Sequence, residues 1–510
     1  MGNGLVKLIV GLLLVLVGAT SARAGAEASV TFGVLDVRGK YDPSSFLTFG
    51  DAMVLHNTLG TLVHPGPNNE LYGFLAEKWE VKDGGLTYRF YIHPKARFSN
   101  GEAVTAQDVV DTFKRAIIYG VQFGDFKQFV EGAAELKSMK GNVTGLKVVS
   151  KSVLEVSLKS PQKDFMNWLT VRELGILRSA DAALKPFDYD FKITSGPFFA
   201  VSMKEGEVVL RRNPHFHLST GNDLRDIRLI PVTANTPYPR MFRDKTLDLA
   251  EPGIPMDPDM GALLEEKALS VTQSESYAVL ALALNSNRPA FSRKAYRNWF
   301  ASKVSPAKLM PFQSDQVFTP AYQILMENVA GSLDVKEAKS IIASHKGEKP
   351  PVKELTLLYQ SHFGKKYEKK LVDYLESVLK LKIRVTSVER IKVNEVAKKQ
   401  TFDLHLLNGG LGDRSAYPIY SYHIDPPLPV YGFSSPKIER LMLEASKLNV
   451  GQREGKMREV SRELVEQSFF VPIAFAPWLT LHRKSLFFKD HHRSITDTEL
   501  WKLSKQNLAE

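Results

Sequence analysis

Two serine–lysine motifs are the first candidates for chemistry in this chain. Ser305 with Lys308, and Ser377 with Lys380, fit the S-x-x-K spacing in which a lysine can activate a serine hydroxyl. The companion motif K-T-G is absent, and neither a G-x-S-x-G elbow nor an H-E-x-x-H motif occurs. Ser305 before Pro306 is also typical of a helix cap followed by a first helical proline. We therefore expect no catalytic residues and a protein that is not an enzyme.

Metal ligands are represented by two close histidine pairs, His215-x-His217 and His491-His492. Two histidines alone make a weak site, and both pairs stand in segments that read as exposed loops. The chain contains no cysteine, which excludes disulfides, thiolate nucleophiles and thiolate metal sites. We expect no metal site and no cofactor.

A net charge of +11 raises the question of nucleic acid or a membrane surface as a partner. The lysines and arginines are scattered along the chain, and no basic stripe is interleaved with aromatic residues. The charge therefore indicates a mildly basic solvated surface, and we expect no nucleic-acid partner.

A glycine run is better suited to ligand binding than to catalysis. Gly409, Gly410 and Gly412 follow the predicted strand 402–407, and ligands of open α/β sheets bind beyond the carboxyl ends of strands. Glycines at that place let backbone groups approach a ligand closely. The run lacks the frame of a nucleotide-binding loop. Asp413 follows it and is either a ligand contact or a turn residue.

The elements that must position these residues can be read from the hydrophobic pattern. Leu86 to Ile92 alternate as a half-buried strand after the turn residues 83–85. Thr105 and Asp108 have the spacing of a capping box, and apolar residues at helical spacing follow until Gly120.

The second half is predicted to contain a βαβ unit with parallel strands. Its elements are strand 355–359, helix 366–380 and strand 381–388. Ser435-Pro436 begins a helix, and 457–469 is the last strong helix. The fold class is α/β, with mixed sheets flanked by helices.

The N-terminus has the features of an export signal. Lys7 precedes the apolar run Leu8–Val17, and Ala22-Arg23-Ala24 fits an A-x-A cleavage site. We expect residues 1–24 to be removed. Since no cysteine is present, the mature chain should not be a lipoprotein.

Residues 75–117 read LAEKWEVKDGGLTYRFYIHPKARFSNGEAVTAQDVVDTFKRAI. The residue types and their order resemble the signature of the family 5 extracellular solute-binding proteins, the peptide- and nickel-type receptors of ABC importers. The resemblance continues through Ser195–Phe198, Val208–Pro214 and Leu280–Pro289 to the C-terminal part of the chain.

This resemblance implies a two-lobed periplasmic-binding-protein fold with a hinge. The first lobe would comprise residues 25–274 plus 474–510, and the second would comprise 275–473. The chain would cross between lobes near 274–278 and 472–477. The implied protein is a periplasmic receptor, expected as a monomer, that delivers a small solute, foremost an oligopeptide, to an ABC permease in the inner membrane.

The family's position for an acid that binds a peptide α-ammonium group falls on Asp413, beside the backbone of Gly409 and Gly410. Four further residues complete the expected ligand site: Arg414, Tyr417, Tyr359 and Ser361. The chain departs from the family where a second acidic motif has become Ala416-Tyr417-Pro418, and where an arginine is missing after strand 355–359. The alternatives are a receptor for a nickel chelate or an oligosaccharide, or a periplasmic sensor or chaperone on the same fold.

Overall fold

The computed structural model describes residues 28–45, 48–66, 70–120, 126–162, 165–218, 224–232, 236–250, 269–310, 318–327, 329–389, 392–411, 416–423, 431–433, 435–448, 450–488 and 499–505. The predicted export signal lies outside these residues. No helix within them combines the length and apolar character that crossing a bilayer requires.

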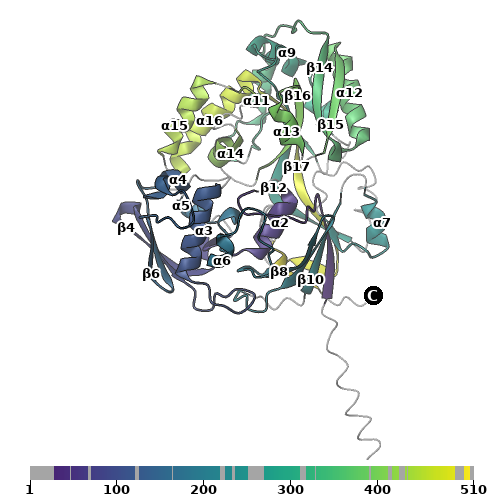
Figure 1. Cartoon of the computed structure of the whole chain (residues 1–510). Helices are drawn as coiled ribbons and strands as arrows, with labels where there is room; N and C mark the ends of the chain where they lie inside the picture. The colour runs from purple at the N-terminus through teal and green to yellow at the C-terminus, as the bar shows by residue number, and fades with distance from the viewer. Residues whose placement is uncertain are drawn as a thin grey trace, which may run out of the picture.

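One large sheet runs through both halves of the molecule (Figure 1). At its centre, the long strands β12 (Leu269–Leu284) and β17 (Phe470–Arg483) pair antiparallel. On one side follow β16 (Leu404–Leu411), β14 (Glu354–Gln360) and β15 (Lys382–Val388). On the other side follow β11 (Leu249–Ala250), β1 (Ala28–Val34), β10 (Leu224–Pro231), β9 (Glu207–Arg212) and β8 (Phe198–Lys204), and β13 (Thr319–Pro320) pairs with β17 off this path.

The ladder between β12 and β17 has two register shifts, a small one between Leu280 and Ala281 and a larger one between Gln273 and Tyr277. It is regular up to the pair Gln273↔Leu479 and resumes at Tyr277↔Pro477, so three residues of β12 face one residue of β17. Such a bulge bends a strand, and Pro477 has no N–H to donate to the ladder. The bulge lies where the chain is predicted to cross between lobes.

The first half of the chain builds a four-stranded antiparallel sheet, β4-β5-β7-β6, next to the helix α3 (Ala106–Tyr119). The predicted alternation is confirmed in β5 (Thr87–Ile92), whose Tyr88, Phe90 and Ile92 are buried, while Leu86 precedes the strand. The other elements of this half are α2 (Phe49–Thr58), β2 (Val63–Pro65), β3 (Leu71–Gly73), β4 (Ala76–Lys82), η2 (Asp83–Gly85), α4 (Phe126–Phe129), η3 (Ala133–Glu135), β6 (Leu146–Ser150), β7 (Val153–Ser157), α5 (Phe165–Trp168), η4 (Arg172–Leu174), α6 (Ser179–Ala182) and α7 (Tyr238–Arg243).

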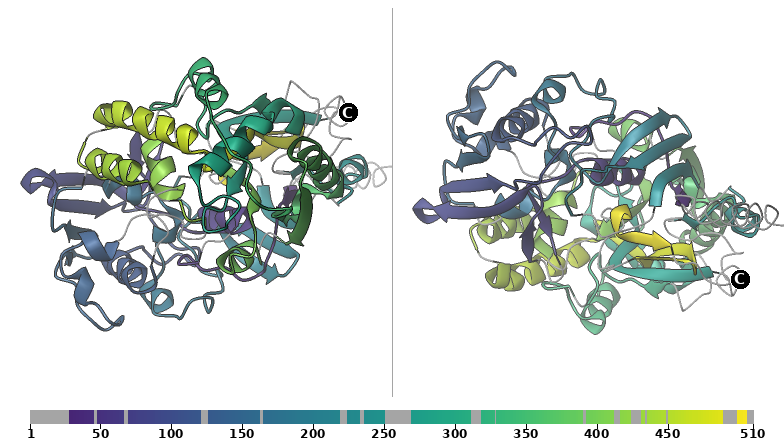
Figure 2. Two further views of the ribbon diagram at one scale, coloured as in Figure 1. Left: turned by 90° about the horizontal axis from the view of Figure 1, so that it is seen from above. Right: turned by 90° about the horizontal axis from the view of Figure 1, so that it is seen from below.

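The second half contains the predicted βαβ unit. Strands β14 and β15 pair in parallel, and α12 (Lys365–Leu379) connects them. Helix α16 (Val450–Gln467) starts earlier than predicted and lies beside α15 (Pro436–Ser446) (Figure 2). The remaining elements are α9 (Lys294–Lys303), α10 (Pro306–Leu309), α11 (Val335–Ala343), η5 (Ser361–Phe363), α13 (Val393–Lys398), α14 (Ala416–His423), β18 (Leu486–Phe488), η8 (Leu500–Lys502) and β19 (Leu503–Lys505).

The hydrophobic core is divided in the same way as the sheet. The largest cluster draws its buried residues from 30–229, from Leu249 and from 486–503. Two other large clusters draw theirs from 278–476, with one addition, Leu35. The end of the chain therefore returns to the core of the first half, which gives the two-lobed α/β architecture that the sequence predicts.

The capping box at the start of α3 is confirmed. The hydroxyl of Thr105 accepts from the Asp108 amide at 3.3 Å, and the Asp108 carboxylate accepts from the Thr105 amide at 2.9 Å. The other carboxylate oxygen accepts from the Ser179 amide at 2.8 Å, which ties α6 to this helix end.

We expect Thr105→Ala to lower the free energy of unfolding by about 1 kcal/mol, because the Asp108 amide loses its hydroxyl acceptor and the Asp108 carboxylate loses the hydroxyl that donates to it. Urea unfolding of the purified protein measures the change. Gln107→Ala, a substitution at an exposed residue of the same turn, is the matched control and should change stability by less than about 0.5 kcal/mol. Equal values for the two variants would contradict a stabilising cap.

Candidate functional site

The carboxyl ends of two parallel strands meet at one edge of the second-lobe sheet. Strands β14 and β16 pair in parallel through Leu357↔Leu404 and Leu358↔His405. On its other side β16 pairs antiparallel with β12 up to Tyr277↔Leu411, directly beside the bulge. Ligands of α/β sheets bind at such carboxyl edges, so this edge, next to the crossing between lobes, is the candidate ligand site.

Gly409 and Gly410 lie inside β16, because the strand continues to Leu411 and does not end at Leu407 as predicted. Their backbone pairs with Val279 and Ala278 of β12. On the β14 side, the ladder stops at His405 among the residues that the structure describes. Beyond that point β16 offers a strand edge to which an extended backbone could be added.

Two predicted contacts, Asp413 and Arg414, lie outside the described residues. Tyr417 lies in α14, half-buried, with the guanidinium of Arg453 4.1 Å from the centre of its ring. A cation over an aromatic face orients the ring, so Tyr417 is held in place from one side.

Tyr359 and Ser361 stand at the carboxyl end of β14 but differ in exposure. Tyr359 is fully buried, and its hydroxyl donates to the Gly364 carbonyl at 2.7 Å. Burial raises the pKa of the Tyr359 hydroxyl. Ser361 opens η5 and is half-buried. The topology therefore brings Ser361 to the same edge as the glycines, while the ring of Tyr359 packs in the second-lobe core.

A buried polar chain lies behind this edge. The amide nitrogen of Gln360 faces Nε2 of His405 at 3.4 Å, and Nδ1 of His405 is 2.6 Å from the Tyr431 hydroxyl. Because an amide N–H can only donate, Nε2 is the acceptor and Nδ1 carries the proton. Burial lowers the pKa of His405 to about 3, so the imidazole is neutral at neutral pH and links β16 to β14 and to Tyr431.

The first lobe contributes a residue that sequence reasoning missed. Asp36 follows β1, whose parallel neighbours are β10 and β11, so it marks the carboxyl edge of the first-lobe sheet. Its Oδ1 accepts from the Thr48 hydroxyl at 2.5 Å. A Cβ at Gly50 would lie 2.1 Å from the Asp36 carbonyl oxygen, so α2 can approach this closely only with glycine there. Leu35, the residue before Asp36, packs in the hydrophobic cluster of the second lobe. This contact places the carboxyl edge of the first-lobe sheet against the second lobe. An acid just beyond the end of an apolar strand is the sequence signal that could have identified Asp36.

The predicted histidine and serine motifs have structural roles where the structure describes them. His217 stacks on His93 with ring centres 4.6 Å apart, and burial together with His93 lowers the pKa of His217 to about 4. His491 and His492 lie outside the described residues. Ser305 occupies the N-cap position of α10 but makes no side-chain capping hydrogen bond. The Ser377 hydroxyl donates to the Tyr374 carbonyl within α12 at 2.7 Å. Three side chains of metal-binding type do converge elsewhere, in the first lobe: His56, His64 and Glu499.

Comparison with known proteins agrees with this architecture. The model of the bacterial extracellular solute-binding proteins, family 5, matches residues 70–424. The dipeptide-binding protein DppE of Bacillus subtilis is 27% identical over 336 residues, which cover 62% of this chain and 61% of DppE. The chain thus aligns with about three fifths of the length of that relative.

Two solved structures share the fold over nearly their whole length. The murein tripeptide binding protein MppA of Escherichia coli superposes with a TM-score of 0.76 at 16% identity, covering 94% of this chain and 98% of MppA. MoaA of A. tumefacien R10, solved in complex with mannopinic acid, gives 0.77 at 17% identity, covering 94% and 100%. The two-lobed binding-protein fold is therefore shown.

The buried His405 predicts a pH dependence of stability. Its pKa is lowered from 6.5 to about 3, so below about pH 6.5 the unfolded chain binds a proton that the folded chain excludes. The free energy of unfolding should therefore fall by about 2 kcal/mol between pH 7 and pH 5 because of this residue. In His405→Gln the fall should be smaller by that amount. Urea unfolding of both proteins at the two pH values measures the difference, and His217 remains in both as the internal control. Parallel pH profiles would contradict a neutral His405.

Proposed function

Since the chain belongs to the bacterial extracellular solute-binding proteins of family 5, we propose that it is a receptor that captures a small solute and delivers it to an ABC-type importer. The observation that carries this proposal is the position of the β16 edge beside the bulge between β12 and β17. A ligand at that edge lies next to the crossing between the lobes and can contact both.

The proposed working cycle is closure of two lobes around the ligand. The lobe boundaries that we propose are residues 25–274 plus 474–510 and residues 275–473. The separate hydrophobic clusters and the bulge at 274–276 support them. A ligand that touches both lobes only in the closed form shifts the population toward that form by its differential affinity.

An oligopeptide is the proposed ligand. An extended peptide can pair with the edge that Asn408 to Gly410 leave beyond the β14 ladder, since main-chain hydrogen bonds suit any side chains. Asp413 is proposed to hold the peptide's ammonium group, and Arg414, Tyr417 and Ser361 to complete the site. Asp36 is the proposed contact from the first lobe.

A non-peptide solute is the second candidate. Its support is the fold neighbour MoaA, which was solved with mannopinic acid, together with Ala416-Tyr417-Pro418 where peptide binders of the family carry an acidic motif. A sensor or chaperone role on the same fold is distinguished by whether a permease binds the loaded protein.

The proposed location is the periplasm, reached through the cleaved signal 1–24, with the inner-membrane permease as protein partner and the receptor itself a monomer. The family name places its members outside the cytoplasm, which supports export. The mature chain should begin near Gly25, and N-terminal sequencing of the protein from the periplasmic fraction tests this.

We expect the radius of gyration to decrease when the cognate solute binds, because hinge motion brings the two lobes together. The solute is first identified by native mass spectrometry of the protein as purified. Small-angle scattering is then recorded on the emptied and the saturated protein. Identical scattering curves at saturation would contradict the hinged mechanism.

Asp413→Asn keeps the shape of the side chain and removes its charge. If Asp413 pairs with a ligand cation, the loss should be about 2–5 kcal/mol of binding free energy, which corresponds to about 30-fold or more in affinity. Calorimetry with the identified solute measures it. Asp373→Asn, at the exposed pair with Lys369 on α12, is the matched control and should bind normally. A change below about threefold in Asp413→Asn would make Asp413 a turn residue and would favour an uncharged solute.

A further inference from the structure

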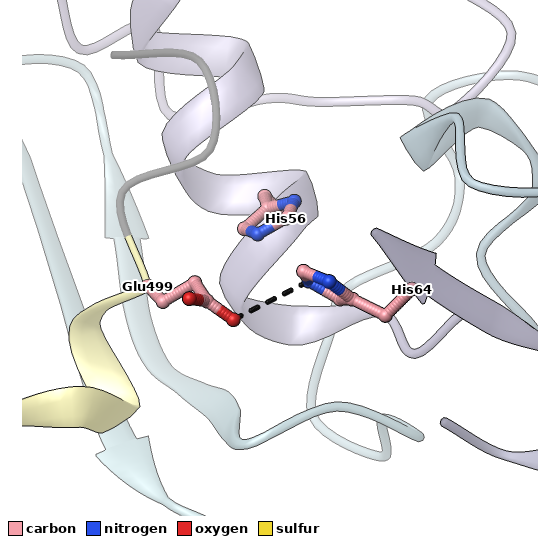
Figure 3. Close-up of side chains that lie close together, drawn as sticks. All are labelled: His56, His64 and Glu499. Carbon is pink, nitrogen blue, oxygen red and sulfur yellow. Dashed lines mark ion pairs between the residues drawn. The ribbon is translucent and has the colours of Figure 1, made fainter. Parts of the chain in front are cut away.

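Three metal-ligating side chains from distant parts of the chain converge in the first lobe (Figure 3). His56 lies in the last turn of α2, His64 lies on β2, and Glu499 directly precedes η8. We propose that they form a binding site for one divalent transition-metal ion, for which Zn²⁺ is the best match. The ion would fasten the C-terminal segment, residues 499–505, to the first lobe.

The distances agree with this assignment. One ligand atom from each side chain can be chosen so that all lie within 4.8 Å of one another, and Nε2 of His64 is 3.4 Å from Oε1 of Glu499. Tetrahedral zinc with bonds of about 2.0–2.1 Å places neighbouring ligand atoms about 3.3 Å apart. The His64–Glu499 edge already has that length, and a small rotation of half-buried His56 would close the rest.

The hydrogen bonding of His64 fixes which of its nitrogens faces the cluster. Its Nδ1 is 2.9 Å from the Pro65 carbonyl oxygen, which can only accept, so Nδ1 carries a proton. In the neutral ring, Nε2 therefore presents a lone pair toward the Glu499 carboxylate. Two lone pairs at 3.4 Å repel each other unless a cation lies between them, and a carbonyl behind the other nitrogen is the usual support of a metal-bound histidine.

One carboxylate oxygen of Glu499 is available to coordinate the ion. Its Oε2 is paired with Nζ of Lys502 at 2.5 Å. Its Oε1 is buried and accepts no hydrogen bond within the described part of the chain. A buried carboxylate oxygen in this condition is costly, and a metal ion would satisfy it.

Aromatic rings surround the cluster on the His64 side. The His64 ring packs on Tyr72 and Phe74, with ring centres 5.3 and 5.0 Å apart, and Trp501 packs on Phe74 at 6.4 Å.

The Leu500 amide donates to Oδ1 of Asn57 at 2.9 Å, so the segment is already docked on α2. An ion held by α2, β2 and Glu499 would cross-link this docked segment and strengthen its attachment. The site shares no residue with the proposed solute site and does not depend on it.

The test uses untagged mature protein that has been stripped with a chelator and returned to chelator-free buffer. A titration with Zn²⁺ against a chromophoric competitor should show one tight site with micromolar or stronger affinity, and Co²⁺ should give the visible absorption of a tetrahedral complex. His56→Ala and Glu499→Gln should each weaken Zn²⁺ binding by at least about tenfold. His93→Ala removes a histidine outside the cluster and should leave the affinity unchanged.

Hydrogen exchange provides a readout of the cross-link itself. Zn²⁺ should slow the exchange of amides in residues 499–505 in the wild-type protein and should not do so in Glu499→Gln. If the wild-type protein binds no Zn²⁺ at one equivalent, or if both variants bind as tightly as it does, the cluster is an ion pair of protonated His64 with Glu499 and the proposal is wrong. If a variant fails to fold, the wild-type stoichiometry, the Co²⁺ spectrum and the exchange of 499–505 decide the matter.

Discussion

The antiparallel pairing of β12 with β17 is the constraint on which the rest of the structure depends. These two strands belong to both halves of the large sheet, and their interrupted register divides it. A regular ladder would resist bending, because each paired residue adds backbone hydrogen bonds across the strands. At the bulge, three residues of β12 face one residue of β17, and Pro477 stands where the pairing resumes. The bulge therefore leaves a local gap in the backbone hydrogen bonds. The proposed hinge motion would change the angle between the two halves of this sheet at the gap and leave each core intact.

The same pairing creates the candidate site. Because β12 occupies one side of β16, the glycine strand is held on that side. The β14 ladder ends at His405, and beyond it no strand that the structure describes pairs with the other side. The buried contacts from His405 to Gln360 and Tyr431 tie β16 to its surroundings. A backbone that is pre-positioned in this way loses little conformational entropy when a ligand pairs with it.

Local patterns in the sequence predicted the elements well. The Thr105–Asp108 capping box and the βαβ unit around α12 follow from short-range spacing, and both are confirmed. The end of β16 was missed because two glycines usually signal a turn, whereas here tertiary pairing with β12 keeps them in the strand. The cluster of His56, His64 and Glu499 has no sequence signature, since its members come from opposite ends of the chain and meet only when the C-terminal segment returns to the first lobe. Asp36 could have been recognised by its place after β1, but its position against the second lobe follows only from the packing of Leu35.

The energies available at the site are of the size that closure requires. Moving a two-state equilibrium from 1:99 to 99:1 takes about 5.5 kcal/mol of differential affinity. A backbone hydrogen bond to a strand edge contributes about 0.5–1.5 kcal/mol net, and a desolvated charge pair about 2–5 kcal/mol. Main-chain bonds to β16 are made in the open and the closed form alike, so they add affinity but do not themselves favour closure. Closure therefore depends on contacts that only the closed form makes, such as a charged pair together with buried apolar surface from the first lobe. A receptor of this design consequently needs an anchor on each lobe, and a solute that pairs with β16 alone would bind without closing the molecule.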